Sequence, residues 1–312
     1  MTPMQNEIMP DEVLPNEVLP DADDLTPLEN DAGAPLFSRH AVETFLSIVT
    51  PLILLSAWEG AARIGWIDTN FFPSPTGVMT TLWEMIRSGE LWEHTSVSIV
   101  RILVGYAFGS LVGIFIGVLM GMSSLARAVL LPIVQATFPI PKLAILPLFI
   151  LIFGLGESSK YAIIAVTVVY MTLINTYEGV RDISPIYLDV GHNYGASRTM
   201  MFFDVALPGA MPSVLAGLKI SMGVSLLVIV AAEFVGAKSG IGFLIWNSWQ
   251  VFAVEKMYVG LFMTAILGFA TAWGFDLLEK IAIPWRKPVV RTSQKHLARS
   301  VVSSTQAKAP AP

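Results

Sequence analysis

Three charged residues lie within long apolar stretches of the sequence: Arg101, Lys142 and Glu233. Charged side chains inside a bilayer are costly, so they face other charges or a polar pathway. On a helix, Arg101 lies about 9 Å beyond Thr95. Glu233 lies about 21 Å beyond Lys219, and Lys142 reaches a similar depth, so all three are expected in the outer half of a membrane. Two positive charges and one negative charge there would suit a small anion. Alternatively, Arg101 and Glu233 pair to hold two helices together while Lys142 extends outward to the surface.

A second set of residues, from Asp189 to Pro208, has the features of a short helix with a start, a bend and a stop. Asp189 suits the first turn of a helix, because its carboxylate can cap backbone N–H groups. Gly195 permits a bend or a close backbone approach. Pro208 is expected to prevent the loop helix from running on into the next apolar stretch. Three hydrophobic side chains could fill a groove on a partner protein: Tyr194, Met200 and Phe202. The alternative is an ordinary amphipathic loop.

The composition indicates that these residues are carried by a membrane protein. Only 14% of the 312 residues are charged and 54% are hydrophobic, with a mean hydropathy of +0.64. Soluble domains contain about 25% charged residues. A bilayer core about 30 Å thick requires about 20 apolar residues per helix, so we predict an all-α fold with about six transmembrane helices. The six predicted spans are residues 42–66, 95–121, 127–153, 160–178, 213–236 and 257–283.

The segment between the first two spans, Phe72 to His94, is polar and contains proline. Its apolar residues recur at helical spacing: Val78, Leu82, Met85 and Ile86. This pattern predicts a helix that lies on the membrane interface rather than crossing it.

Two spans have unusual compositions. The third contains four prolines, with Lys142 between them: Pro132, Pro139, Pro141 and Pro147. Proline interrupts helical hydrogen bonding, and such a break needs protein or water around it, so this span is predicted to be kinked and to line a pathway. The second has glycine at every fourth position: Gly105, Gly109, Gly113, Gly117 and Gly121. This stripe predicts close packing against another helix.

The distribution of charge predicts the domain boundaries and the orientation. Residues 1–38 contain nine acidic and no basic side chains, so we expect residues 1–40 to be a disordered acidic leader, followed by a transmembrane domain over 41–285. Residues 286–312 contain no acid and six basic side chains: Arg286, Lys287, Arg291, Lys295, Arg299 and Lys308. Basic residues near span ends favour the cytoplasm. Both termini and the loop of residues 179–212 are therefore predicted to be cytoplasmic.

Several classes of function are disfavoured by the sequence. The chain has no cysteine, and its four histidines show no ligand spacing, so no metal site is predicted. No phosphate loop of the GxxxxGK[ST] type and no catalytic motif of a membrane enzyme is present. A channel or secondary carrier that is not coupled to an ATPase stays open as an alternative. Loss of Gly195 would leave such a protein conducting.

The 189–208 segment resembles the EAA loop of ABC importer permeases. Gly195 is followed by nine residues and then by Val205, Ala206, Leu207 and Pro208, while Asp189, Val190 and Gly191 stand where that family usually has Glu-Ala-Ala. Further phrases across residues 45–285 resemble the nitrate, sulfonate and taurine branch of these permeases. They are Phe72–Pro75, Ser98–Arg101 with Gly105, Pro139–Leu148, Phe153–Glu157 with Lys160, Asn175 and Gly179, and Ala232–Glu233 with Gly240–Gly242.

The resemblance implies a type I importer permease of the bacterial inner membrane that works by alternating access. It implies two ABC ATPase subunits, which hold ATP and magnesium, so that this chain binds no cofactor and is no enzyme. The other implied partners are a periplasmic or lipid-anchored solute-binding protein, a second permease subunit and membrane lipid, with no nucleic acid. The implied solute is a small anion such as a sulfonate, taurine, nitrate or bicarbonate. The implied ATPase-coupling residues are Asp189, Gly191, Tyr194, Gly195, Ala196, Leu207 and Pro208.

Overall fold

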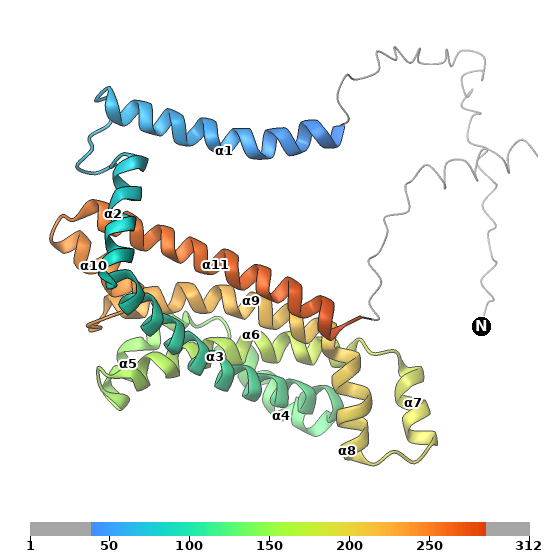
Figure 1. Cartoon of the computed structure of the whole chain (residues 1–312). Coiled ribbons are helices and arrows are strands. Elements are labelled where there is room, and N and C mark those ends of the chain that lie inside the picture. Colours follow the sequence, from blue (N-terminus) through green and yellow to red (C-terminus); the bar gives the residue numbers. More distant parts are fainter. Residues whose placement is uncertain (1–38, 285–312) are drawn as a thin grey trace, which may run out of the picture. The chain divides into compact units, whose positions relative to one another are not determined.

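The structure, a computed structural model, describes residues 39–284, and every regular element in this range is a helix (Figure 1). The predicted basic tail, 286–312, and the predicted acidic leader up to residue 38 lie outside the described residues. The chain divides after Ala57 into two units. Among the described residues, the first unit consists of the greater part of α1 (Arg39–Arg63). All later elements belong to the second unit.

Within residues 39–284, five helical runs are long and apolar enough to cross a membrane. They are Glu43–Arg63 of α1, α3 (Glu90–Met122), α6 (Glu157–Arg181), the run Arg198–Phe234 and α11 (Val254–Ala282). A bent pair of helices, α4 (Ser124–Thr137) and α5 (Leu146–Phe153), makes a sixth crossing if it is counted as one span. The prediction of an all-α fold with about six spans is confirmed. Several helices extend beyond the predicted bounds, because their polar ends continue the helix outside the apolar stretch.

The predicted kink in the third span is confirmed as a sharp break. The helical segments on either side of it, Ser124–Thr137 and Lys142–Phe153, meet at 89°. The second segment begins with one 3-10 turn, η1 (Lys142–Ile145). The break falls at Pro139 and Pro141, which have no N–H to continue the hydrogen bonding of α4. Pro132 lies inside α4 without ending it.

The glycine stripe of α3 packs directly against α6. A Cβ atom on Gly105 would lie 2.7 Å from Ile164, and one on Gly117 would lie 2.7 Å from the carbonyl oxygen of Leu173. The two backbones therefore approach more closely than any residue with a side chain would allow. This contact confirms the packing role predicted for the stripe.

The helix predicted between the first two spans is α2 (Pro75–Ser88). The Ser74 side chain caps its start by accepting a hydrogen bond from the N–H of Gly77 at 3.1 Å. Much of its apolar face is covered by protein, because Val78 and Met85 pack with Leu244 and Val259, whereas Ile86 is 51% exposed. These partners belong to α10 (Ile241–Gln250) and α11. The apolar periodicity of α2 thus reflects packing within the second unit.

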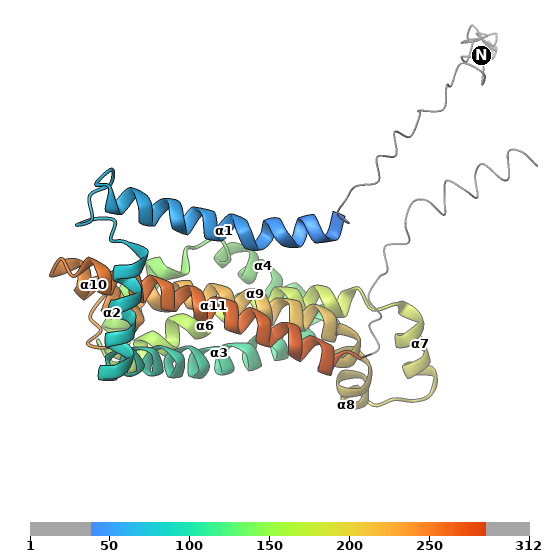
Figure 2. The same ribbon diagram turned by 45° about the horizontal axis from the view of Figure 1, so that its top comes forward.

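The loop segment after α6 folds into two short helices, α7 (Pro185–Asn193) and α8 (Arg198–Met200). A π-helical turn, η2 (Met201–Ala206), then leads into α9 (Leu207–Phe234). In both views α7 and α8 lie at the end of the second unit away from α2 and α10 (Figures 1 and 2).

Candidate functional site

The bend at Gly195 has the hydrogen bonds of a Schellman motif, which ends a helix with a left-handed glycine. The Ala196 N–H donates to the carbonyl of Gly191 at 2.9 Å, and the Gly195 N–H donates to the carbonyl of His192 at 3.0 Å. Gly195 has φ +72°, a conformation that side chains disfavour. Gly195 therefore ends α7 and turns the chain toward α8.

An exposed apolar row runs along α7 to this bend. Its members recur at helical spacing, with exposed fractions of 49% to 88%: Ile186, Tyr187, Val190 and Tyr194. Apolar side chains gathered on one exposed helix face are typical of a docking surface. Met200, on α8, is also exposed, at 53%. Phe202 is instead partly buried against the cluster that contains Val118 and Val180, so only part of its side chain is left to contact a partner.

Asp189 does not lie in the first turn of a helix, contrary to the prediction. It is the fifth residue of α7, and its side chain is exposed. The helix begins earlier because Pro185 occupies its first turn, where the absent N–H of proline costs no hydrogen bond. Gly191 has a packing role, since a Cβ atom there would meet the sulfur of Met201.

Pro208 does not separate the loop helix from the following span, which also corrects the prediction. Helical structure is continuous from Arg198 to Phe234. The π-helical turn immediately before Pro208 gives a wider ring, in which the Leu207 N–H donates to the carbonyl of Phe202, five residues back. Such a turn accommodates the missing donor and the bulk of the proline ring. Leu207 packs in the same cluster as Ala210 and Val214.

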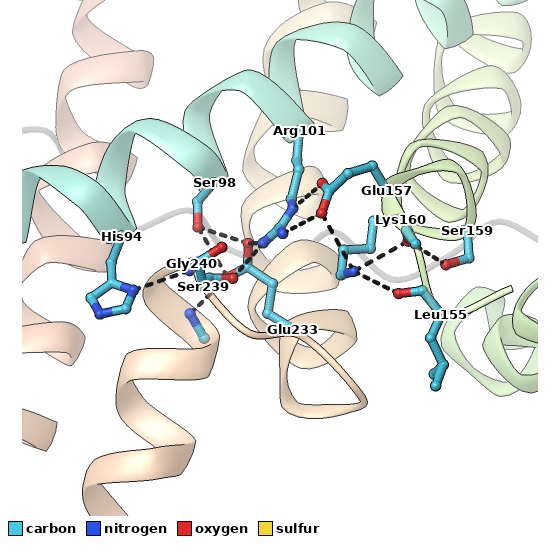
Figure 3. A network of polar contacts seen from close by, with 12 residues as sticks. His94, Ser98, Arg101, Leu155, Glu157, Ser159, Lys160, Glu233, Ser239 and Gly240 are labelled. Atoms are coloured by element: carbon cyan, nitrogen blue, oxygen red, sulfur yellow. Dashed lines mark hydrogen bonds and ion pairs between the residues drawn. The ribbon is translucent and has the colours of Figure 1, made fainter.

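Arg101 joins α3 to α6 and α9 through two carboxylates (Figure 3). Its Nε and Nη2 donate to the two oxygens of Glu157 at 2.5 and 2.6 Å. Its Nη1 donates to Glu233 at 2.7 Å and to the carbonyl oxygen of Ser239 at 2.6 Å. The Arg101 side chain is only 2% exposed. The structure thus brings together Arg101 and Glu233, two of the three charged residues singled out in the spans.

Glu233 is buried and accepts further hydrogen bonds. The Ser98 hydroxyl lies 2.8 and 3.0 Å from its two oxygens, and the Gly242 N–H donates to it at 2.8 Å. Ser98 in turn accepts from the N–H of Ile241 at 2.8 Å. These bonds fasten the start of α10 to α3, and they leave each oxygen of the buried carboxylate with a donor.

Two charged members of this network, Glu157 and Lys160, were not predicted as site residues. Lys160 is 4% exposed, lies 3.8 Å from Glu157, and donates to the carbonyl oxygens of Leu155 and Gly156. With two cations and two carboxylates the network is formally neutral, whereas the sequence predicted an excess of one positive charge. The sequence did contain a signal for these two residues. Glu157 and Lys160 stand three positions apart at the start of the fourth span, and this spacing puts both on one helix face.

Lys142 takes no part in this network. Its ammonium group donates to the carbonyl oxygens of Thr137, Phe138 and Ile140 at 2.8, 3.1 and 3.1 Å. It also lies 4.0 Å from the centre of the Tyr170 ring, a distance typical of a cation–π contact. Lys142 therefore caps the carbonyl groups that the break after α4 leaves open.

Replacement of Lys142 by methionine is expected to lower the free energy of unfolding by about 2 kcal/mol, because hydrogen bonds to a charged group are lost at the break. Thermal unfolding of the detergent-purified chain measures the change. Lys280→Met is the matched control, since Lys280 is exposed near the end of α11. An equal effect of the two variants would show that Lys142 does not stabilise the break.

Comparison with known proteins identifies relatives of this chain. The family described as binding-protein-dependent transport system inner membrane component matches residues 109–282. A putative aliphatic sulfonates transport permease protein of Escherichia coli is 34% identical, over 75% of this chain and 89% of its own length. The taurine transport system permease protein of Escherichia coli is 32% identical, over 78% and 90%. A nitrate import permease protein of Synechocystis is 32% identical, over 80% and 93%.

A solved structure with the same fold is the MetNI methionine ABC transporter in an inward-facing conformation. The similarity has a TM-score of 0.56 at 17% identity, and it covers 65% of this chain and 98% of the matched chain. At this identity the likeness shows the fold alone, and that fold is a type I ABC importer permease.

Proposed function

Since the chain belongs to the family of binding-protein-dependent transport system inner membrane components, we propose that it is the membrane-spanning permease of an ATP-driven importer. In this proposal two separate ATPase subunits bind and hydrolyse ATP with magnesium, so the permease itself carries out no covalent chemistry. A solute-binding protein delivers the solute from outside the cell, and a second permease subunit completes the pathway. The protein lies in a bacterial inner membrane with α7, α8 and both termini on the cytoplasmic side.

The observation that carries the proposal is the exposed apolar row of α7. A short helix with such an apolar face can dock into a groove on a partner protein. The face of α7 consists of Ile186, Tyr187, Val190 and Tyr194. The row lies on a segment whose following helix is continuous with the long helix α9. A push or pull on α7 and α8 by closing ATPase subunits would therefore reach the bundle through a rigid element. This linkage supports alternating access, in which closure of the two ATPase subunits around ATP reorients the membrane-spanning helices.

The solute is proposed to be a small anion of the sulfonate, taurine, nitrate or bicarbonate class. The names of three relatives support this class, since they refer to aliphatic sulfonates, taurine and nitrate. These anions share delocalised negative charge on oxygen atoms, so guanidinium and N–H donors are the protein groups that suit them.

Replacement of Tyr194 by serine is expected to reduce the amount of ATPase that co-purifies with the permease by about tenfold, because a central aromatic contact of an interface is lost. Tyr194 is 88% exposed, so the permease itself should fold normally. Gly195→Asp should act in the same direction by placing a charge at the bend. The measurement is the ratio of ATPase to tagged permease after purification, together with ATP turnover.

Trp92→Ser is the matched control, because Trp92 is an exposed aromatic residue (71%) in the first turn of α3, at the other end of that helix from Met122. It should keep the wild-type ratio. A wild-type permease that retains no ATPase and transports solute alone after reconstitution would overturn the proposal in favour of a secondary carrier.

A further inference from the structure

A cavity of about 560 Å³, open to the surface, lies along α4 from Ser124 to Gln135 and beside the C-terminal end of α6. Four polar side chains line it together with Ser124: Arg127, Gln135, Tyr177 and Arg181. Within residues 39–284, neither guanidinium group has a carboxylate within ion-pair distance. These two arginines therefore differ from Arg101, whose charge is fully matched inside the protein.

The cavity continues toward the break in the third span. A second hollow shares Gln135, Tyr177 and Arg181 with the first and extends to Phe138, where α4 ends. Gln135 lies 11 residues beyond Ser124, about 17 Å along the helix axis. Its amide is exposed and makes no hydrogen bond to any described residue. In the proposed permease α4 lies within the membrane, where an amide without a hydrogen-bond partner is unfavourable against lipid chains, so the cavity suits water and a polar molecule.

The lining groups determine which charge a bound molecule should carry. Two guanidinium groups, an amide, a phenol and a hydroxyl all offer hydrogen-bond donors, and guanidinium groups bind planar or tetrahedral oxoanions through paired N–H groups. Among the residues that line the two hollows the one acid is Glu178, which is exposed; Asp182 follows Arg181 directly but lines neither hollow. The formal charge of the lining residues is therefore +1, which favours an anion over a cation.

We propose that this cavity, the α4–α6 oxoanion site, holds a small oxoanion as it passes through the inner part of the pathway. The proposal rests on the proposed function, and it assigns solute contact to Arg127 and Arg181 rather than to Arg101. Sulfonate solutes and phospholipid phosphates share the chemistry that this site recognises, so the experiment must separate them.

The absence of cysteine from the whole chain allows a direct test by single-cysteine labelling. Ala128→Cys places a thiol in the cavity, next to Arg127. Thr199→Cys is the matched control, because Thr199 is exposed and follows directly after Arg198. Each purified full-length variant is reacted with anionic sulfonatoethyl methanethiosulfonate and with cationic trimethylammonioethyl methanethiosulfonate. We expect the ratio of anionic to cationic rates to be about tenfold higher at position 128 than at position 199, because the cavity concentrates anions.

Two further sets of variants and two added ligands test the origin of the preference. Arg127→Gln with Arg181→Gln should reduce the ratio to that of the control, whereas Glu178→Gln should raise it further. Free methanesulfonate should slow the anionic reaction at position 128, and phosphatidylglycerol in the detergent should not.

Equal ratios at the two positions, or a preference that survives loss of both arginines, would overturn the oxoanion site. Protection by phosphatidylglycerol without protection by methanesulfonate would assign the cavity to a lipid headgroup and overturn the solute assignment. Because no ATPase is needed, failure here is distinct from failure of ATPase co-purification, which tests the proposed function.

Discussion

Replacement of Arg101 by methionine is expected to lower the free energy of unfolding by about 3–5 kcal/mol, which is typical for removing one partner of a buried ion pair. Arg101 and Glu233 are 2% and 0% exposed, so the carboxylate would stay buried without its counter-charge. Hydrogen bonds from Ser98 and Gly242 would still reach it but cannot neutralise it. Thermal unfolding of the purified protein in detergent should show the loss directly.

Two further variants separate the charge from the packing in this experiment. Glu157→Gln should have a much smaller effect, because this position is 48% exposed and water can solvate the side chain that replaces the carboxylate. The double variant Arg101→Met with Glu233→Gln should recover part of the loss, because no buried charge is left uncompensated. A double variant less stable than Arg101→Met would show that shape, and not charge balance, decides the effect.

Replacement of Gly109 by valine is expected to destabilise the protein by about 3 kcal/mol, at the upper end of the usual cost of overpacking. A Cβ atom at this position would lie 2.5 Å from the carbonyl oxygen of Ala165 and 2.8 Å from Val168 on α6. A backbone carbonyl cannot rotate away as a side chain can, so the two helices must separate. The shift of the thermal midpoint, relative to the unmodified chain, measures this cost.

Gly223 provides the matched control for this prediction. It lies within α9 and has no atom within 4 Å of an added Cβ. Gly223→Ala should therefore be neutral or stabilising by up to about 1 kcal/mol, because alanine favours the helix over glycine. If Gly109→Val were tolerated as well as Gly223→Ala, the close contact between α3 and α6 would not stabilise the fold.

Features that depend on neighbouring residues in the chain could be predicted from the sequence. The spans follow from runs of apolar residues, and the break of the third span follows from Pro139 and Pro141, since proline acts on its own turn of helix. The close-packing face of α3 follows from glycine at every fourth position, because that spacing places all five on one side. The left-handed bend at Gly195 is likewise a property of a single residue type.

Pro208 shows where this local reasoning fails. Proline was expected to separate the loop from the following span, but the chain forms a π-helical turn and continues as one helix. That solution is stabilised by packing of Ala206 and Ala210 with Val118 and Val180, which lie far away in the sequence. Local propensity alone cannot weigh such contacts.

The sequence by itself determined the number of spans, the break, the glycine face and the bend, because each depends on residues within a few turns of one helix. Only the tertiary structure decided the partners of the charges. Arg101 meets Glu157 across 56 positions and Glu233 across 132, while Arg127 and Arg181 share a cavity and form no ion pair within the described residues. Ion pairing depends on distances between helices, and no periodicity within a helix encodes which faces meet.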